Sequence, residues 1–78
     1  MKRASKAFYT DVGHRLHQAR MAKGWSLATL ARKASSSPQG ICGYEAGRCL
    51  PNGDTLYNLC TALGVSADWI LGLKEKEA

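Results

Sequence analysis

The chain has 78 residues, with 11 Lys and Arg against 6 Asp and Glu, which gives a net charge of +5. This length allows one domain and excludes a second catalytic lobe. The composition, 45% hydrophobic and 22% charged, is that of a folded globular domain. The longest apolar stretches are a few residues long, whereas a membrane-spanning helix needs about 20, and no apolar signal core follows the basic start. We therefore expect a cytoplasmic binding module that contacts no membrane.

Charge is unevenly distributed along the chain. Residues 1–48 carry nine basic and two acidic residues, a net charge of +7, whereas residues 49–78 have a net charge of −2. A basic half favours a polyanionic partner, most simply nucleic acid. The alternative is a solvated surface that only keeps the protein soluble.

The first two predicted helices show apolar residues at helical spacing. The first helix ends at Gly24, and its apolar face consists of Phe8, Val12, Leu16 and Ala19. Ser26 is a good N-cap for the second helix, which ends near Ser35. Its apolar stripe consists of Leu27, Leu30, Ala31 and Ala34.

A third helix is predicted about three residues after the second ends. Ser37 and Pro38 form its N-cap and first turn, because the fixed φ and missing N–H of proline do no harm there. Ile41 and Tyr44 supply its inward contacts, and Gly47 ends it.

Two further helices complete the predicted set of five. Asn52 caps the fourth, which ends at Gly64 and has one apolar face made of Leu56, Leu59, Cys60 and Leu63. Ser66 caps the fifth, whose apolar residues are Trp69, Ile70 and Leu73. No segment alternates with a period of two residues, so an all-α fold is expected.

Cysteine and histidine spacing indicates neither a disulfide framework nor a metal site. The three cysteines are an odd set without a CxxC pair, and we interpret them as reduced thiols. His14 and His17 are three residues apart, but the cysteines lie outside any recognised ligand spacing from them. We interpret both histidines as solvated and expect no metal or cofactor.

The second and third helices, with the short turn between them, have the pattern of a helix-turn-helix. Such a unit presents its second helix to the DNA major groove. It needs short polar groups near the helix N-terminus and an apolar back that fixes the crossing angle. The polar groups are Ser36, Ser37 and Gln39, and the apolar back consists of Leu30, Ala31 and Ile41.

The sequence resembles the Cro and phage-repressor type helix-turn-helix family, also called XRE or lambda repressor-like. About sixty of the 78 residues follow the family's order and spacing. The matching segments are Val12-Gly13-His14-Arg15-Leu16, Arg20-Met21-Ala22-Lys23-Gly24-Trp25-Ser26, Leu30-Ala31, Ile41, Tyr44-Glu45-Ala46-Gly47, Pro51, Leu56 and Ala62-Leu63-Gly64-Val65-Ser66-Ala67-Asp68-Trp69-Ile70-Leu71.

This resemblance implies a five-helix domain over residues 8–73, with a flexible basic arm at 1–7 and a charged tail at 74–78. It implies a transcription regulator, not an enzyme, that binds a near-palindromic operator in double-stranded DNA as a homodimer. No small-molecule substrate is expected. The dimer contact falls on Ala67, Asp68, Ile70 and Leu71.

The resemblance also assigns roles to single residues. Gln39 stands where family members hydrogen-bond base edges, and Ser37, Arg48 and Asn52 stand where they contact phosphates. Arg20 and Glu45 would form a structural ion pair. Together with residue type and position, this gives ten candidate DNA-binding residues: Lys33, Ser36, Ser37, Pro38, Gln39, Gly40, Cys42, Gly43, Arg48 and Asn52.

Three departures from the family pattern affect these expectations. Leu27 occupies a position where many members have a DNA-contacting Gln, so that contact is expected to be missing. Ser35 replaces the usual turn glycine, which implies a turn that is strained or built differently. Gly40 and Gly43 offer no side chains for reading bases, so either the backbone approaches the groove closely or specificity is weak.

Cys42 lies on the same side of the third helix as Gln39. There it either contacts a thymine methyl group or is a small exposed residue.

The alternative function is a protein-interaction module, such as an antitoxin or anti-repressor, with the same fold. The two glycines and Leu27 are the features that favour it. An enzyme is the least supported class, because no set of nucleophile, base and orienting residue is visible.

Overall fold

The structure, a computed structural model, describes residues 5–74. These residues form five helices and no strand, which confirms the predicted all-α fold: α1 (Lys6–Lys23), α2 (Leu27–Lys33), α3 (Pro38–Glu45), α4 (Gly53–Leu63) and α5 (Ala67–Ile70). Within this part of the chain, no helix is both long and apolar enough to cross a bilayer.

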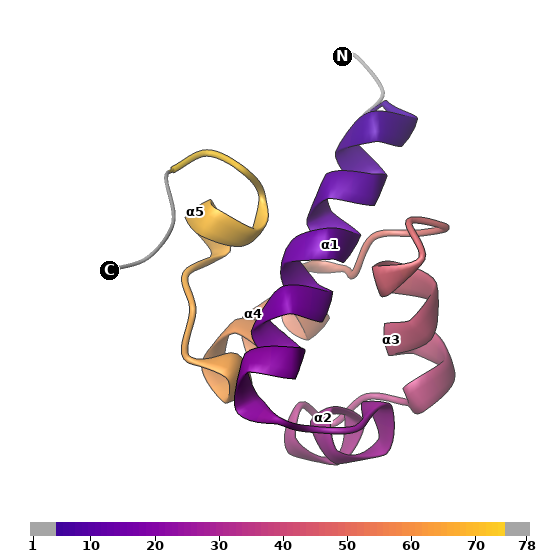
Figure 1. Cartoon of the computed structure of the whole chain (residues 1–78), viewed down its shortest axis with the longest axis vertical. Helices are drawn as coiled ribbons and strands as arrows, with labels where there is room; N and C mark the ends of the chain where they lie inside the picture. Colours follow the sequence, from indigo (N-terminus) through magenta and orange to yellow (C-terminus); the bar gives the residue numbers. More distant parts are fainter. Residues whose placement is uncertain (1–4, 75–78) are drawn as a thin grey trace.

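The long helix α1 organises the other four. It crosses the middle of the view in Figure 1, with α3 on one side, α5 on the other and α2 near its C-terminal end. It packs against α3, α4 and α5, while α2 packs against α3 and α4. The two helices of the helix-turn-helix are therefore held by the rest of the bundle, and α3 lies at the edge of the molecule.

The core receives side chains from all five helices. Its largest fully buried side chains are Val12, Leu16, Leu30, Ile41, Leu59 and Ile70. Burying one such aliphatic side chain contributes about 1.5 to 3 kcal/mol relative to leaving it exposed. The apolar faces predicted for α1 to α4 therefore point inward, although Phe8, Leu27, Tyr44 and Leu56 are only partly buried.

Each helix begins at a polar cap whose side-chain oxygen accepts a hydrogen bond from the backbone N–H three residues later. The bond lengths are 2.9 to 3.1 Å, and the caps are Ser5, Ser26, Ser37, Asn52 and Ser66. Such a bond satisfies one of the free N–H groups of the first turn. Gly24 and Gly64 end α1 and α4 with φ angles of 72° and 71°, as predicted.

Several predicted boundaries are wrong by a few residues. Residues 6 and 7 belong to α1 and not to the arm predicted over 1–7. Residues 1–4 and 75–78, which hold the rest of that arm and most of the predicted tail, lie outside the described residues. Helix α2 ends at Lys33, two residues before its expected end. Helix α3 ends at Glu45 with Ala46 as its C-cap, and Gly47, which was predicted to end it, follows with a left-handed φ of 77°.

The fifth helix is shorter than its apolar pattern predicted. It ends at Ile70, and Leu73, which was expected on its inner face, is 74% exposed. Gly72 has a φ of 79°, and the N–H of Leu73 donates to the carbonyl oxygen of Asp68 at 2.8 Å. This left-handed turn carries Leu73 away from the core.

Candidate nucleic-acid interface

The turn between α2 and α3 is strained at Ser35, one of the two possibilities that follow from the replacement of the usual turn glycine. Ser35 has a φ of 53° and is the single non-glycine residue with positive φ among residues 5–74. The turn is closed by the N–H of Ser36, which donates to the carbonyl oxygen of Ala31 at 2.8 Å. A left-handed conformation costs an L-residue about 1 to 2 kcal/mol. The chain therefore keeps the turn geometry that glycine usually supplies, at a cost in stability.

The first turn of α3 presents polar groups and a rigid backbone. Ser37 Oγ accepts from the N–H of Gly40 at 3.0 Å, and Pro38 follows at the first helical position. A hydroxyl that accepts one bond can still donate its proton to an outside oxygen. The aligned N–H groups of a helix N-terminus also favour an anion. This end of α3 can therefore hold a phosphate.

One exposed side of α3 carries the side chains suited to reading bases. Gln39 and Cys42 are one helical turn apart, and both are exposed, as their spacing predicted. Together with Leu27, Pro38 and Arg48 they line one open pocket. A glutamine amide donates and accepts hydrogen bonds, so it can pair with an adenine edge.

The two glycines of α3 have reasons within the chain itself. A Cβ atom on Gly40 would lie 3.1 Å from Ser37 Oγ, the atom that caps the helix. Gly43 is buried, and a Cβ there would lie 3.3 Å from Cys49 Sγ. The prediction that Gly43 is a DNA-binding residue therefore conflicts with its burial. Its Cα faces the segment after α3, where a side chain would have to displace Cys49 by a few tenths of an ångström.

The candidate phosphate contacts lie at three different places. Arg48 is exposed after α3 and borders the same pocket as Gln39. Asn52 Oδ1 caps α4 by accepting from the N–H of Thr55 at 2.9 Å, and its NH₂ group is a donor that can reach a phosphate. The ammonium group of Lys33 lies 5.0 Å from the centre of the Trp25 ring, within the range of a cation–π contact.

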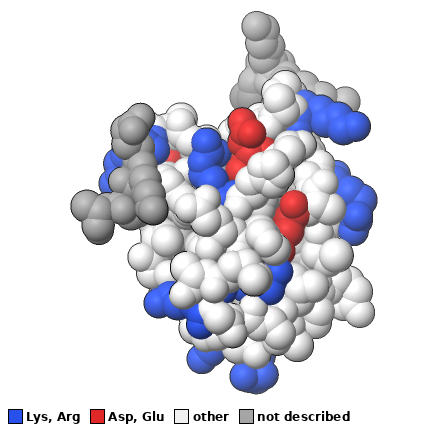
Figure 2. All heavy atoms as spheres, in the orientation of Figure 1, with Lys and Arg blue, Asp and Glu red and all other residues white. Residues whose placement is uncertain are grey.

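Basic side chains lie on several parts of one face of the molecule. In the view of Figure 2, Lys and Arg atoms lie over α2 at the lower end, at the upper right and at the right edge, and others lie in the middle of the face. Acidic atoms lie in the upper half of this face. Helix α3 itself carries no Lys or Arg, so the positive charge beside it comes from Arg32 and Lys33 of α2 and from Arg48.

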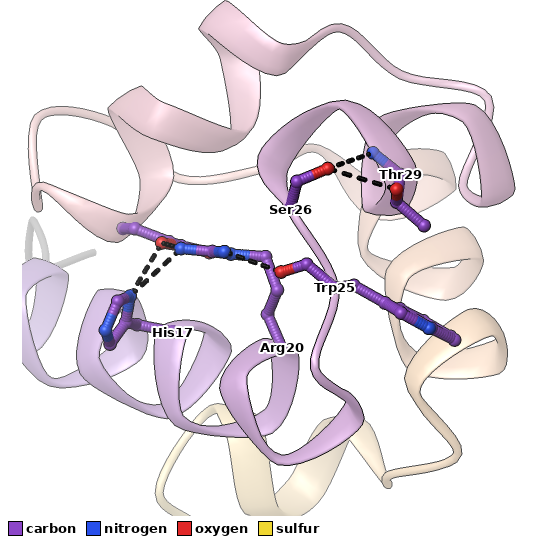
Figure 3. Close-up of polar contacts among 6 residues, drawn as sticks. His17, Arg20, Trp25, Ser26 and Thr29 are labelled. Atoms are coloured by element: carbon purple, nitrogen blue, oxygen red, sulfur yellow. Dashed lines mark hydrogen bonds and ion pairs between the residues drawn. The ribbon is translucent and has the colours of Figure 1, made fainter.

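Arg20 and Glu45 form the predicted ion pair and tie α1 to the end of α3. Arg20 Nε donates to Glu45 Oε2 at 2.8 Å, and Arg20 Nη2 donates to Oε1 at 2.9 Å. The third bond of the guanidinium runs from Nη1 to the carbonyl oxygen of Trp25 at 2.8 Å. The side chains of the pair are only 11% and 9% exposed. Figure 3 shows this group, with the guanidinium plane between His17 and Trp25.

Burial and hydrogen bonding compete in setting the charge of this pair. Burial disfavours the ionised form of Glu45, but the bonds from Arg20 and His17 outweigh it and lower the pKa of the carboxyl group. The hydrogen bond to Glu45 raises the pKa of Arg20 against the opposing effect of burial. Both groups are therefore charged at neutral pH.

His17, which we interpreted as solvated, belongs to the same network. Its Nδ1 lies 3.0 Å from Glu45 Oε1 and 3.2 Å from Arg20 Nη2. With a proton, this nitrogen donates to the carboxylate; without one, it accepts from the guanidinium. His17 thus contacts the ion pair in either state, although its side chain is half exposed.

Gly13 is a structural residue whose role the apolar spacing of the first helix does not predict. A Cβ atom there would lie 2.5 Å from the carbonyl oxygen of Tyr44 and 2.6 Å from that of Glu45. Only a residue without a side chain allows α1 to approach α3 this closely. The signal was a glycine in the middle of an apolar helical pattern, which usually has a packing reason.

The candidate dimer residues differ in their accessibility. Asp68 is exposed, and Ala67 and Leu71 are partly buried. Ile70 is fully buried in the core of its own chain, so its placement in a dimer contact is wrong. Its position on α5 matched the family segment, but its side chain points inward, toward the core.

Comparison with known proteins identifies the class and then the family. A helical bundle in which a short turn joins α2 to an N-capped α3 at the edge of the molecule is a helix-turn-helix domain. A family model described as a helix-turn-helix domain matches residues 11–69, and the chain belongs to this family. The family and the fold are those of DNA-binding transcription regulators, and the resemblance to the repressor-like type is confirmed.

Two solved structures illustrate the likeness. The restriction-modification controller protein C.AhdI from Aeromonas hydrophila is 31% identical, with a TM-score of 0.76 over 83% of this chain and 97% of that one. The P22 c2 repressor, solved in complex with a synthetic operator, is 29% identical, with a TM-score of 0.74 over 76% of this chain and 89% of that one.

Sequence relatives come from bacteria and from eukaryotes. The HTH-type regulator YonR of Bacillus subtilis is 39% identical over 76% of this chain and 55% of its own length. Multiprotein-bridging factor 1 of Candida albicans is 42% identical over 80% of this chain and 41% of its own. Several of the relatives are thus matched over only about two fifths of their length.

Proposed function

We propose that the protein is a sequence-specific DNA-binding transcription regulator that binds a near-palindromic operator as a homodimer. The observation that carries this proposal is the exposed side of α3, where Gln39 and Arg48 border one pocket beside the helix N-terminus. An amide that can pair with a base and a cation that can bind a phosphate, next to each other on one surface, support the proposal.

The ion pair supports this function by fixing the recognition helix. Glu45 is the last residue of α3, and its carboxylate is held from α1 through two bonds with Arg20. A base contact requires a helix held at a constant angle to the groove. We therefore assign Arg20 and Glu45 to positioning α3 and not to contacting DNA.

The homodimer would place two copies of α3 in successive major grooves, about 34 Å apart. We propose that its interface uses Ala67, Asp68 and Leu71, of which Ala67 lines the groove between α4 and α5. Sedimentation of the free protein and of its complex with the best duplex tests this. A monomer in both states would overturn the dimer but not DNA binding.

The experiment that tests the function is a titration with random duplex DNA at two salt concentrations. Binding through phosphates releases counterions, so affinity must fall steeply as salt rises. Selection of bound duplexes from a random pool then tests sequence preference. A folded protein that binds no duplex at low salt would overturn the proposal.

The second candidate is a protein-interaction module with the same fold. It is favoured by relatives whose name describes multiprotein bridging and by Leu27, an apolar residue on the candidate surface. Association with a partner protein through apolar contacts would weaken little with salt. The salt dependence measured in the titration with duplex DNA therefore distinguishes the two candidates.

A further inference from the structure

The two asparagines of the chain stand in different chemical settings. Asn52 precedes Gly53 at the start of α4, whereas Asn58 lies within α4 and precedes the buried Leu59. Asparagine is among the thermolabile residues, because the backbone nitrogen of the next residue can attack its side-chain amide carbon. Glycine hinders this attack least, since it has no side chain. Asn52 therefore has the neighbour that the reaction needs, and Asn58 does not.

The structure leaves the attacking nitrogen of Gly53 accessible. Asn52 and Gly53 are exposed, and a Cβ atom placed on Gly53 would have nothing within 4 Å. The N–H of Gly53 belongs to the first turn of α4 and has no acceptor among the described residues. The nitrogen that follows Asn58 lies in the interior of α4, where an N–H group donates to the carbonyl oxygen four residues earlier. Attack on Asn52 thus requires no helical hydrogen bond to break at the nitrogen.

The cap of α4 favours the same attack from the side of the amide. The N–H of Thr55 donates to Asn52 Oδ1 at 2.9 Å. When a nucleophile adds to a carbonyl carbon, negative charge develops on the oxygen, and a hydrogen-bond donor already aimed at that oxygen stabilises it. The bond that caps α4 therefore also makes Asn52 Cγ more susceptible to the Gly53 nitrogen.

We propose that Asn52 is a site of spontaneous deamidation that lowers the affinity of the protein for DNA. The Gly53 nitrogen loses its proton and bonds to Asn52 Cγ, the bond from Cγ to the side-chain nitrogen breaks, and ammonia leaves with that proton. Water then opens the resulting cyclic succinimide to aspartate or isoaspartate. No oxidant or reductant takes part. The effect on DNA rests on the proposed function, whereas the reaction itself does not.

Deamidation would reverse the character of the side chain at a candidate phosphate contact. The NH₂ group of Asn52, a hydrogen-bond donor, is replaced by a carboxylate oxygen, which only accepts and which repels phosphate. Aspartate is as good an N-cap as asparagine, and a negative charge is favourable at a helix N-terminus. The aspartate product should therefore remain folded while it loses affinity for DNA.

The reaction is tested first, on the whole folded chain kept at mildly alkaline pH for several weeks. Mass spectrometry with fragmentation locates each converted amide, and an isoaspartyl methyltransferase detects isoaspartate. We expect Asn52 to be converted well before Asn58, which is the internal control. In Gly53→Ala, which has space for the new methyl group, the rate at Asn52 should fall to near that at Asn58.

The effect on DNA binding is tested with Asn52→Asp, which has the side chain of the aspartate product. The loss of a hydrogen bond to a charged group corresponds to a loss of about tenfold in affinity, which we expect for all duplexes alike. The melting temperature should be unchanged or higher. Asn58→Asp is the matched control, because it makes the same change of charge further along α4, and it should bind nearly as tightly as the wild type.

Four outcomes would overturn parts of the inference. If Asn52 is converted no faster than Asn58, there is no deamidation site, and the proposed function stands. If Gly53→Ala is converted as fast as the wild type, the Gly53 nitrogen is not the nucleophile in the way argued. If Asn52→Asp binds duplexes as tightly as the wild type, deamidation does not control binding. If the folded wild type binds no duplex at low salt, the proposed function fails, and with it the effect on DNA, whereas the measured conversion of Asn52 is unaffected.

Discussion

Arg20 Nε and Nη2 lie 2.8 and 2.9 Å from the two carboxylate oxygens of Glu45. This bidentate ion pair links α1 to the last residue of α3. Parallel hydrogen bonds of this kind are strong and fix orientation. The helix that faces DNA in the proposed function is therefore held at its C-terminal end by a buried ion pair.

Replacing Glu45 by Ala should lower the free energy of unfolding by about 3 kcal/mol, because it leaves the buried guanidinium of Arg20 without its carboxylate. His17→Ala is the matched control and should cost less than about 1 kcal/mol, since His17 is half exposed. Thermal melting of the free proteins measures both. A Glu45→Ala variant with an unchanged melting temperature but lost DNA binding would reverse the role assigned to the pair.

Acid should weaken the same contact. The pKa of Glu45 is lowered below its ordinary value of 4.5, so the unfolded chain takes up a proton at a higher pH than the folded one. The stability from this pair is therefore complete above about pH 4.5 and is lost as the pH falls through the folded pKa. The melting temperature should fall less over this range in Glu45→Gln than in the wild type. Asp54→Asn, at an exposed carboxylate, should retain the wild-type decline.

The approach of α1 to α3 depends on Gly13. In Gly13→Ala the new Cβ would meet two backbone oxygens, which cannot move aside as a flexible side chain can, so we expect a loss of about 3 kcal/mol. Gly53→Ala is the matched control, because a Cβ there has nothing within 4 Å. It should be neutral or stabilise α4 by up to about 1 kcal/mol. Equal melting temperatures for the two variants would contradict the close contact.

The turn of the helix-turn-helix should be stabilised by Ser35→Gly. Glycine removes the cost of the positive φ but adds chain entropy to the unfolded state, which leaves a net gain of about 0.5 to 1 kcal/mol. For a domain of this size, the melting temperature should rise by about 4 °C. Ser36→Gly, at a neighbouring residue without positive φ, should give no such gain. A destabilised Ser35→Gly variant would show that the serine side chain, and not the backbone, determines this turn.

Local signals in the sequence predicted most of the helix starts. An N-cap depends only on residues within three positions of it, so the sequence alone predicts four of the caps: Ser26, Ser37, Asn52 and Ser66. The resemblance also supplied the pairing of Arg20 with Glu45, residues 25 positions apart. No periodicity could have provided that contact.

The errors concern which way a residue faces after packing. Ile70 belongs both to the apolar pattern of the fifth helix and to the family segment that implies a dimer contact, and its burial where α5 packs against α1 and α4 shows that the apolar pattern is the correct guide. Gly43 is a candidate DNA-binding residue by its position in α3, yet it is buried and its Cα faces Cys49 of the segment after the helix. Such contacts join parts of the chain that local spacing does not relate.

The central claim is that α3 reads bases through Gln39 while Arg48 binds phosphate. The most direct measurement is the affinity of the wild type, Gln39→Ala and Arg48→Ala for the selected duplex and its single-base variants at several salt concentrations. Gln39→Ala should lose about 1 to 3 kcal/mol, with discrimination relaxed at one base position. Arg48→Ala should weaken all duplexes about equally and reduce the salt slope by about one unit. If Gln39→Ala weakens every duplex by the same factor, α3 does not read bases through this residue, and the claim is wrong.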